Sequence, residues 1–369
     1  MAEKVKFINV EKTDFFYTVR SRVDQYFVEK GISRHANAAM VFKTICMLCM
    51  WFVPYALILS GSFSPLAMLG FAAIMGFGGA GIGLSIMHDA NHGGYSSDGR
   101  VNYLLGSCIN LVGGSAFTWK IQHNILHHTF TNIYEHDEDL DPSGTMRFTP
   151  NAEHKSFFKF QHVYATFLYG IMTLFWVLHK DFVQLKRYDT KNLIKGTRGT
   201  YAKELRIMIA TKVAYYIYML IIPMVIMDIS FLQWLAGFML MHFIMGVVLG
   251  YVFQLAHVVE DTHFPKPNPE NSIENEWAIH QMYTTANFAR KNRLLSWYVG
   301  GLNYQVEHHL FPKVCHIHYR NLAPIVIQTA KEFNVPYYDQ PTFWGALKSH
   351  FRLMKKMGQP DVVSIPEAA

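Results

Sequence analysis

The sequence is poor in charged residues and in cysteine. Only 16% of its 369 residues are charged, whereas an ordinary soluble protein has about a quarter. With a hydrophobic content of 51% and 19 methionines, this shortage points to a protein in contact with lipid and excludes a disordered chain. The cysteines are too few and too scattered for a disulfide framework, so we interpret them as reduced packing residues. They are Cys46, Cys49, Cys108 and Cys315.

Long stretches without charge predict transmembrane helices. Residues 44–87 contain no Asp, Glu, Lys or Arg, and residues 213–259 contain only Asp228. Because one spanning helix needs about 20 apolar residues, each stretch has room for a helical hairpin. Turn-like segments at residues 60–65 and 227–230 divide the two stretches. We therefore predict an all-α integral membrane protein whose four transmembrane helices lie at about residues 40–60, 65–87, 207–227 and 231–255.

Two further apolar segments, residues 101–119 and 157–178, are expected to be too short or too polar to span. The second carries Lys159, His162 and His179. We expect both segments to form interfacial or partly buried helices that lie along the membrane face.

The basic residues predict the orientation in the membrane. All 33 Lys and Arg lie outside the two hairpin turns. Under the positive-inside rule, this distribution places both termini and the long central segment in the cytoplasm. The first 35 residues are polar and mixed in charge, so no cleavable signal peptide is expected. A membrane surface accounts for the net charge of +6, so no nucleic-acid partner is expected.

The 19 histidines are unusually many, and they gather in clusters. The clusters are His88 with His92, His123 with His127 and His128, and Gln305 with His308 and His309. Residues four apart lie on one face of a helix, so the side chains of each cluster can point at one spot. Three such clusters on one side of the membrane indicate a metal centre rather than three separate pairs of core or surface histidines. His257 ends the fourth predicted helix at the same depth as His88, and we expect it to be a further ligand.

The number of candidate ligands favours a particular metal chemistry. Eight imidazoles and an amide exceed what one tetrahedral zinc ion needs, and structural zinc would normally recruit cysteine. Two metal ions with open positions fit better, and the membrane setting favours redox iron among the metals that imidazole suits. Carboxylates beside the clusters are candidates to orient the imidazoles, although residues 135–141 could equally be a hydrated acidic loop. These carboxylates are Asp89, Glu135, Asp137, Glu138, Asp139, Asp141, Glu260 and Glu307.

The three clusters resemble the histidine boxes of membrane fatty acid desaturases. The third box, within residues 303–312, has Gln305 at its first position, which is similar to the front-end subgroup of delta-5 and delta-6 acyl desaturases and sphingolipid delta-8 desaturases. The resemblance covers residues 38–335. It implies a four-helix membrane base with a cytoplasmic helical cap that holds two iron ions. The implied reaction uses dioxygen and two electrons to introduce a cis double bond into an acyl chain, carried as acyl-CoA or acyl-lipid, for example at the delta-6 position.

On this basis we divide the chain into three parts: a cytoplasmic N-terminal segment (1–37), the desaturase domain (38–335) and a cytoplasmic C-terminal tail (336–369), loosely held after Gly358. The His-Pro-Gly-Gly haem motif of a fused cytochrome b5 does not occur in the sequence. We therefore expect electrons from a separate ferredoxin or cytochrome b5 and its reductase. The expected dock for an acidic carrier is the basic surface at Lys120, Lys313 and Arg320.

An apolar tunnel would align the acyl chain and exclude water. Aromatic neighbours of the histidines could form its walls or could be ordinary core residues. They are Trp119, Phe130, Phe253 and Tyr304. A basic run could hold a phosphate-bearing head group or CoA, or could simply belong to the positive-inside face. It consists of Lys180, Lys186, Arg187 and Lys191.

Two alternatives stay open at this point. The same histidines could serve a di-iron hydroxylase or acetylenase, and the acyl chain could belong to a sphingolipid. A histidine-rich metal transporter would place polar residues near the middle of the membrane, where only His242 is expected. His154 and His350 lie outside every cluster, so we expect both to be dispensable for activity.

Overall fold

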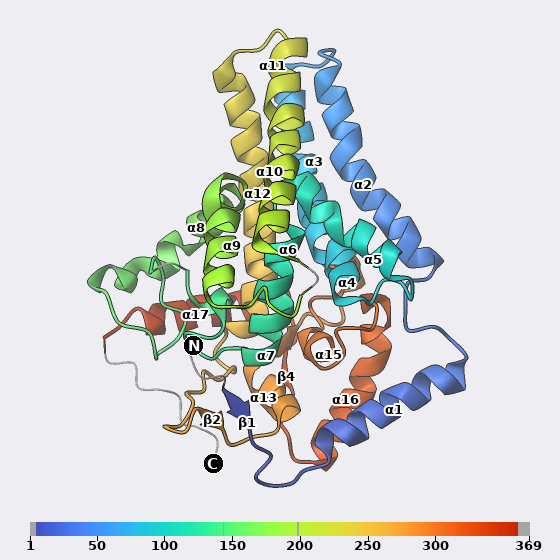
Figure 1. Ribbon diagram of the computed structural model, residues 1–369, viewed down its shortest axis with the longest axis vertical. Helices are drawn as coiled ribbons and strands as arrows, with labels where there is room; N and C mark the ends of the chain where they lie inside the picture. The colour runs from blue at the N-terminus through green and yellow to red at the C-terminus, as the bar shows by residue number, and fades with distance from the viewer. Residues whose placement is uncertain (1–4, 143, 198, 361–369) are drawn as a thin grey trace.

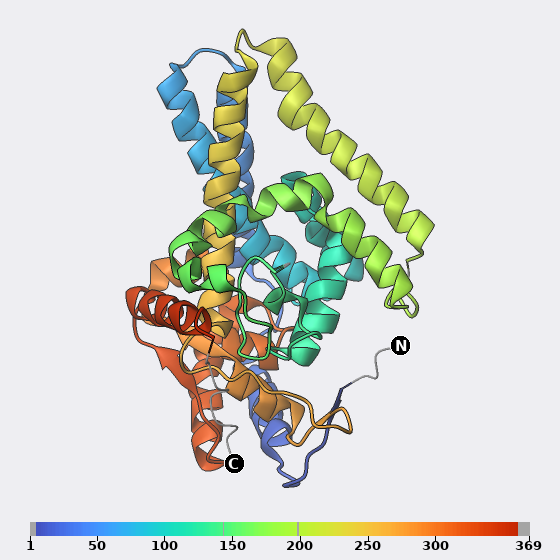
Figure 2. The same ribbon diagram turned by 90° about the vertical axis from the view of Figure 1, so that its left-hand side faces the viewer.

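Four long apolar segments and a group of shorter elements occupy opposite ends of the molecule (Figure 1). The computed structural model describes residues 5–142, 144–197 and 199–360, and the described chain is mostly helical. The connections between α2 and α3 and between α11 and α12 lie together at one end, as Figures 1 and 2 both show. The predicted pair of helical hairpins is therefore present.

The first hairpin consists of α2 (Ala38–Leu59) and α3 (Pro65–Gly81). Asn37 caps α2 by accepting a hydrogen bond from Met40 N at 3.2 Å, and Ser64 caps α3, which begins at Pro65. The helix of α3 continues through a π-helical segment, η1 (Ile82–Met87), into α4 (His88–His92). The second spanning helix thus runs on from its predicted end at residue 87 into the first histidine cluster.

The second hairpin begins at α10 (Tyr201–Tyr216), which continues through η7 (Ile217–Ile221) into α11 (Ile222–Ile226). It returns as α12 (Phe231–His257). A capping box fixes the start of α12, because Ser230 and Gln233 satisfy each other's backbone N–H groups. Both helices extend beyond the predicted bounds, and α12 reaches His257 without a break.

The hairpins present apolar side chains outwards. On α10 and α11, Val213 is 50% exposed and Val225 is 78% exposed. Such a face is unfavourable in water and suits the hydrocarbon of a bilayer. Five helices of the described chain are long and apolar enough to cross a membrane, and four of them are the helices of the two hairpins. The protein is therefore a membrane protein.

The fifth candidate, Ser156–Thr190, corrects an expectation. The segment at residues 157–178 is not too short to span, because it is part of a continuous 35-residue helix. That helix consists of η5 (Ser156–Phe160), α8 (Gln161–Phe175), η6 (Trp176–Lys180) and α9 (Asp181–Thr190). In Figure 2, α8 and α9 (green) bend around the lower half of the hairpins and do not reach the end where the hairpin turns lie.

Residues 101–119 also differ from the prediction, because they do not form one interfacial helix. Gly113, with a φ of 86°, breaks the chain between η2 (Ser107–Val112) and α6 (Ala116–Lys120). The break reverses the chain after α5 (Gly99–Gly106) and η2. From α6 the chain enters a second π-helical segment, η3 (Ile121–His127), and then α7 (His128–Phe130).

The shorter elements form a cap at the other end of the hairpins (Figure 1). Its apolar core joins α1 to α13, α15 and α16. The helices of the cap are α1 (Phe15–Lys30), η4 (Glu138–Leu140), α13 (Trp277–Thr284), α14 (Arg293–Tyr298), α15 (Gln305–Leu310), η8 (His316–His318) and α16 (Tyr319–Glu332). Two short parallel strand pairs add to it: β1 (Lys6–Phe7) with β2 (Ser272–Ile273), and β3 (Ala286–Phe288) with β4 (Tyr338–Gln340).

The C-terminal segment packs onto this body instead of trailing from it. After β4, the helix α17 (Phe343–Met357) contacts α8 and α12. His350 of α17 is fully buried, and its Nδ1 lies 2.7 Å from the carbonyl oxygen of Val258. The residues from 336 to 360 are thus part of the folded core, and residues 361–369 of the expected tail lie outside the described residues.

Candidate metal centre

The eight predicted histidines converge between the hairpins and the cap. His88 and His92 come from α4 and His257 from the end of α12, so two spanning helices contribute. The others come from η3, α7 and α15, and all eight are buried. The expected common depth of His88 and His257 is therefore realised in the fold, because both helices end at the cap.

The histidines fall into two groups that each could hold a metal ion. The ligand atoms within each group lie within 4.8 Å of one another. The first group is His88, His92, His123 and His308, and the second is His127, His257 and His309. His128 lies between them, because it forms a further such group with His308 and His309. Two adjacent sites thus share the whole predicted set of histidines.

The π-helical turn of η3 decides how the second cluster is divided. The i, i+4 spacing predicted that His123 and His127 point at one spot, but they belong to different groups, although both also lie near Asp139. Instead, His123 Nε2 lies 3.2 Å from His128 Nε2, five residues later. A π-helix aligns residues five apart, so the local backbone and not the α-helical repeat sets this pairing.

Unpartnered ring nitrogens show that the histidines fit a metal. Four of them place Nδ1 near a protein oxygen and leave Nε2 buried without a hydrogen-bond partner in the described structure. The pairs are His127 with Asp137 at 2.9 Å, His257 with the Thr284 carbonyl at 3.2 Å, His308 with the Tyr319 hydroxyl at 3.2 Å, and His309 with Gln281 at 2.7 Å. A ring that donates Nδ1–H has an Nε2 lone pair free for a cation.

The first group shows the same fit through its nitrogen contacts. His88 Nε2 lies 3.1 Å from His123 Nε2, so the ring nitrogens of two imidazoles from different elements face each other directly. Two imidazole nitrogens bound to one ion at about 2.1 Å also lie about 3 Å apart. His92 Nε2 is likewise buried without a partner in the described residues. The donor set and its spacing therefore suit bound metal in both groups.

Burial keeps these imidazoles in the neutral form that binds metals. Desolvation holds the pKa values of His123, His128, His308 and His309 well below the usual value. His127 differs, because the negative charge of Asp137 outweighs burial and raises its pKa. Burial alone would raise the pKa of Asp137, but the charge and hydrogen bond of His127 outweigh this effect and lower it. Asp137 therefore orients the ring of His127 through a charged hydrogen bond.

The predicted carboxylates divide into those that support the site and those that do not. Asp137 contacts His127 directly, and Asp139 contacts Gln122 and lies 3.6 Å from His127. Glu307, which belongs to the third cluster, is buried and accepts hydrogen bonds from Asn287 and Tyr337. Glu135 is exposed, and Glu260 pairs with Arg352 on the surface. The expectation that Glu135 and Glu260 orient imidazoles is therefore wrong.

Other residues at the site gave no signal in the sequence. Gln281 of α13, the backbone of Thr284 and Tyr319 of α16 each hold a ring, and each lies outside the histidine clusters. Asp89 faces His316, whose Nδ1 lies 2.8 Å from its carboxylate, and His316 Nε2 lies 2.7 Å from Lys43 Nζ. Only the cap's path across α4 and α2 brings these three residues together.

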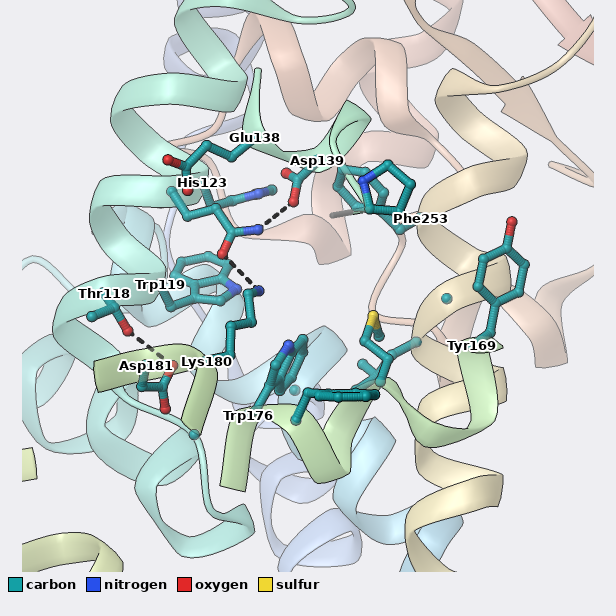
Figure 3. A pocket seen from close by; sticks show the side chains of 18 of the residues that line it. Thr118, Trp119, His123, Glu138, Asp139, Tyr169, Trp176, Lys180, Asp181 and Phe253 are labelled. Carbon is teal, nitrogen blue, oxygen red and sulfur yellow. Dashed lines mark hydrogen bonds between the residues drawn. The ribbon is translucent and has the colours of Figure 1, made fainter. Parts of the chain in front are cut away.

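A cavity of about 530 Å³ adjoins the first histidine group. It runs past His88 and His123 between α3, α12 and the α8–α9 segment (Figure 3). Of the aromatic residues predicted to wall it, Trp119 and Phe253 do so. Phe130 instead stacks on Phe7 near the cap surface, and Tyr304 is buried in the cap core. Gln305 also lines the cavity, is buried, and interacts with His257.

The basic run contributes only part of its charge to this cavity. Lys180 and Arg187 line it, and Lys180 projects towards the wall that carries Trp119 and His123 (Figure 3). Lys186 and Lys191 are exposed and are not among the residues of its lining. These two lysines therefore lie on the surface outside the cavity.

Spanning helices with two buried groups of histidines that suit metal ions, beside a largely apolar cavity, indicate a membrane oxidoreductase. Residues 63–341 match the sequence pattern of the Fatty acid desaturase family. The chain is 36% identical to an sn-1 linoleoyl-lipid 6-desaturase of Synechocystis sp., over 97% of this chain and 99% of that protein. It is also 37% identical to an acyl-lipid (8-3)-desaturase of Physcomitrium patens, over 96% of this chain and 74% of that protein. The chain belongs to the fatty acid desaturase family and is an oxidoreductase that acts on acyl chains.

Proposed function

We propose that this protein is a front-end acyl-lipid desaturase that introduces a cis double bond near the carboxyl end of a glycerolipid acyl chain. The convergence of eight buried histidines beside an apolar cavity carries the proposal. The relatives support the substrate class, because those from Synechocystis sp. and Arthrospira platensis are both sn-1 linoleoyl-lipid 6-desaturases. The delta-6 position is accordingly the first to test.

We propose two iron ions as the metals, held by His88, His92, His123, His127, His128, His257, His308 and His309, with Gln305 in or just outside this set. Bound iron would supply the activation of dioxygen that removal of hydrogen from an unactivated methylene demands. The chain's own residues then have three tasks. The cavity walls align the acyl chain, Trp119 and Phe253 exclude water beside the histidines, and Asp137 and Gln281 hold the imidazoles in place.

The reaction balances only with electrons from outside. Two hydrogen atoms leave the acyl chain, and two electrons with two protons from a carrier and solvent complete the reduction of dioxygen to two waters. The sequence has no haem motif and no cysteine cluster for an iron–sulfur centre. We propose a separate ferredoxin or cytochrome b5, with its reductase, as the carrier.

The proposed topology has four spanning helices, namely the two hairpins, with the cap and both termini in the cytoplasm. Its support is that Lys and Arg avoid the hairpin turns and that α8 and α9 do not reach the level of those turns (Figure 2). A membrane-impermeant maleimide tests it in intact cells. Cysteine placed at Ser62 should react from outside, whereas cysteine placed at exposed Lys313 should react only after lysis.

Product analysis tests the function. The chain is expressed in a host of known lipid profile, and new double bonds are located by mass spectrometry of intact lipids and of the released fatty acids. A new cis double bond near the carboxyl end of a lipid-bound chain supports the proposal. A hydroxylated product, or conversion of acyl-CoA alone, contradicts it.

A further inference from the structure

Lys180 is a half-buried cation that lines the cavity and that the metal centre does not explain. Its Nζ donates a hydrogen bond to Gln122 Oε1 at 3.0 Å and lies 5.2 Å from the centre of the Trp176 ring. Gln122 directly precedes His123 in the sequence. The side chains of Lys180, Trp176, Gln122 and His123 all line the cavity. Figure 3 shows Lys180 extending towards the wall that carries His123 and Trp119.

Unlike the other cation in the cavity lining, Lys180 makes no direct ion pair with a described residue, although Asp139, Asp181 and Glu138 are near enough to interact with its charge. Arg187 pairs with Glu138 at 2.9 Å. Among the described residues, no carboxylate oxygen lies within 4.0 Å of Lys180 Nζ. An ammonium has three N–H donors, and removing it even partly from water is costly unless these donors meet acceptors. Since Gln122 accepts one of them, the cavity offers donors to a ligand at this point.

We propose that Lys180 binds the carbonyl oxygen of the substrate's acyl ester and thereby selects which carbons are desaturated. This inference rests on the proposed function. The carbonyl is the one strong acceptor that an acyl-lipid carries next to its hydrocarbon chain. When it is held beside Gln122, the neighbour of His123, the first carbons of the chain lie nearest to the histidines. The position of the ester then determines the position of the double bond, as front-end chemistry requires.

The charges of the cavity favour a neutral carbonyl over an anionic group. Glu138, Asp139 and Asp141 line the same cavity as Lys180. These carboxylates oppose a free fatty acid or the phosphates of CoA at this end of the cavity. An ester carbonyl accepts a hydrogen bond from the ammonium without adding negative charge. The polar end of the cavity therefore suits an acyl chain that is already esterified.

Variants at Lys180 test this through regiochemistry. Lys180→Met keeps the length of the side chain and removes its donors, whereas Lys180→Arg keeps donors. The matched control is Lys186→Met, on the exposed face of the same helix. Each is reconstituted with its electron carrier and a diacyl glycerolipid that the wild type converts. We expect kcat/KM of Lys180→Met to fall by about tenfold and its product to carry double bonds at several positions. Lys180→Arg should keep one position, and Lys186→Met should match the wild type.

A purely structural role predicts a different pattern. Gln122 also contacts Asp139, which lies 3.6 Å from His127, so loss of Lys180 could loosen that ligand. Such loosening would lower the rate and the iron content while the double bond stayed at one position. That outcome, or a Lys180→Met enzyme within about twofold of the wild type at the same position, overturns the proposal.

The substrate can be altered instead of the enzyme. An alkyl ether glycerolipid of the same chain length lacks the carbonyl, so the wild type should convert it about tenfold less efficiently and at several positions. Lys180→Met should not distinguish ester from ether. If the wild type treats both lipids alike, the proposal is wrong even where Lys180→Met fails to accumulate. Failure of the wild type to desaturate the ester lipid would instead contradict the proposed function.

Discussion

His127 shows how one residue of the site is held. Its ring lies between Asp137, which orients Nδ1, and the second histidine group, towards which the unpartnered Nε2 is directed. His127→Ala should lower activity by more than about a hundredfold, because a ligand is lost outright and not merely reoriented. Iron per chain should fall as well. The amount of protein in the membrane should not change, since insertion depends on the apolar helices and their flanks.

The control for His127 has to be chosen from the structure. His154 lies 3.1 Å from the carbonyl oxygen of Gly358 and packs edge-on against Phe158, away from both histidine groups, so His154→Ala should keep activity. The expectation that His350 is equally dispensable is not supported by its surroundings. His350 is fully buried between Tyr169 and Val258, so His350→Ala should destabilise the fold by about 1–3 kcal/mol. Equal activity in His127→Ala and His154→Ala would show that the histidine clusters are wrongly assigned.

His316 links two buried charges next to the first group. Its Nε2 faces Lys43 Nζ at 2.7 Å, and its Nδ1 and backbone N–H both face Asp89, whose other oxygen lies 3.9 Å from His88 Nδ1. His316→Leu removes the hydrogen-bond partner that both buried charges share, and it should destabilise the protein by about 3 kcal/mol or more. His316→Gln, which offers both an acceptor and a donor, should recover most of that loss.

Thermal unfolding in detergent measures the His316 variants, and iron per chain reports on His88. Both quantities should fall in His316→Leu and recover together in His316→Gln. If His316→Leu and His316→Gln are equally stable, the link that His316 makes between Lys43 and Asp89 does not contribute to stability.

At the scale of elements, small residues set the distance between helices. A Cβ at Gly246 of α12 would lie 2.3 Å from the backbone oxygen of Tyr169 on α8, so the two helices approach too closely for a side chain. Gly246→Ala should therefore separate them and cost roughly 1–3 kcal/mol. Gly237→Ala on the same helix is the control, because a Cβ there meets only Ala72 Cβ at 3.8 Å.

Gly246→Ala should lower the melting temperature, whereas Gly237→Ala should raise it or leave it unchanged. Alanine stabilises a helix by about 1 kcal/mol relative to glycine where it has room. Since α8 and α12 both line the cavity, the separation should also lower kcat/KM. If Gly246→Ala is as stable as Gly237→Ala, the close approach of α8 and α12 is not required for the fold.

At the scale of the whole molecule, the metal centre joins the membrane base to the cap. Purified protein from iron-replete, zinc-poor culture should contain two iron ions per chain. Chelation should lower its melting temperature. A ligand whose free concentration is about a hundredfold above its Kd adds about 2.7 kcal/mol to the stability of the folded state, and chelation removes that contribution. Metal analysis with calorimetry before and after chelation measures both effects. One zinc ion and no iron under these conditions would sink the di-iron proposal.

The electron supply is a property of the assembled system. Enzyme with lipid substrate, dioxygen and NAD(P)H alone should be inactive, and activity should appear when a ferredoxin or cytochrome b5 and its reductase are added. Lys313 and Arg320 are exposed on the cap, and Lys120 is half-buried, so a basic dock for an acidic carrier remains a prediction. Its association should weaken as salt rises, because exposed charges are screened. Full turnover without a carrier would overturn this account.

The sequence by itself determined the parts of the protein that depend on local pattern. Charge-free runs defined both hairpins, since a bilayer selects helices by length and apolarity alone. The spacing of histidines identified seven side chains that the fold brings together, and the position of His257 at the end of the fourth predicted helix identified the eighth. Family membership followed from the same motifs.

Only the tertiary structure decided how those parts combine. The π-helical turn of η3 and the return of α17 onto the core depend on packing between distant segments, and neither has a local signature. The same holds for Gln281, Tyr319 and Lys43, which meet the site through elements far away in sequence. Lys180 likewise reads as one positive charge among several until the fold places it, half-buried, in the cavity lining beside Gln122, since its surroundings and not the sequence determine the cost of a charge.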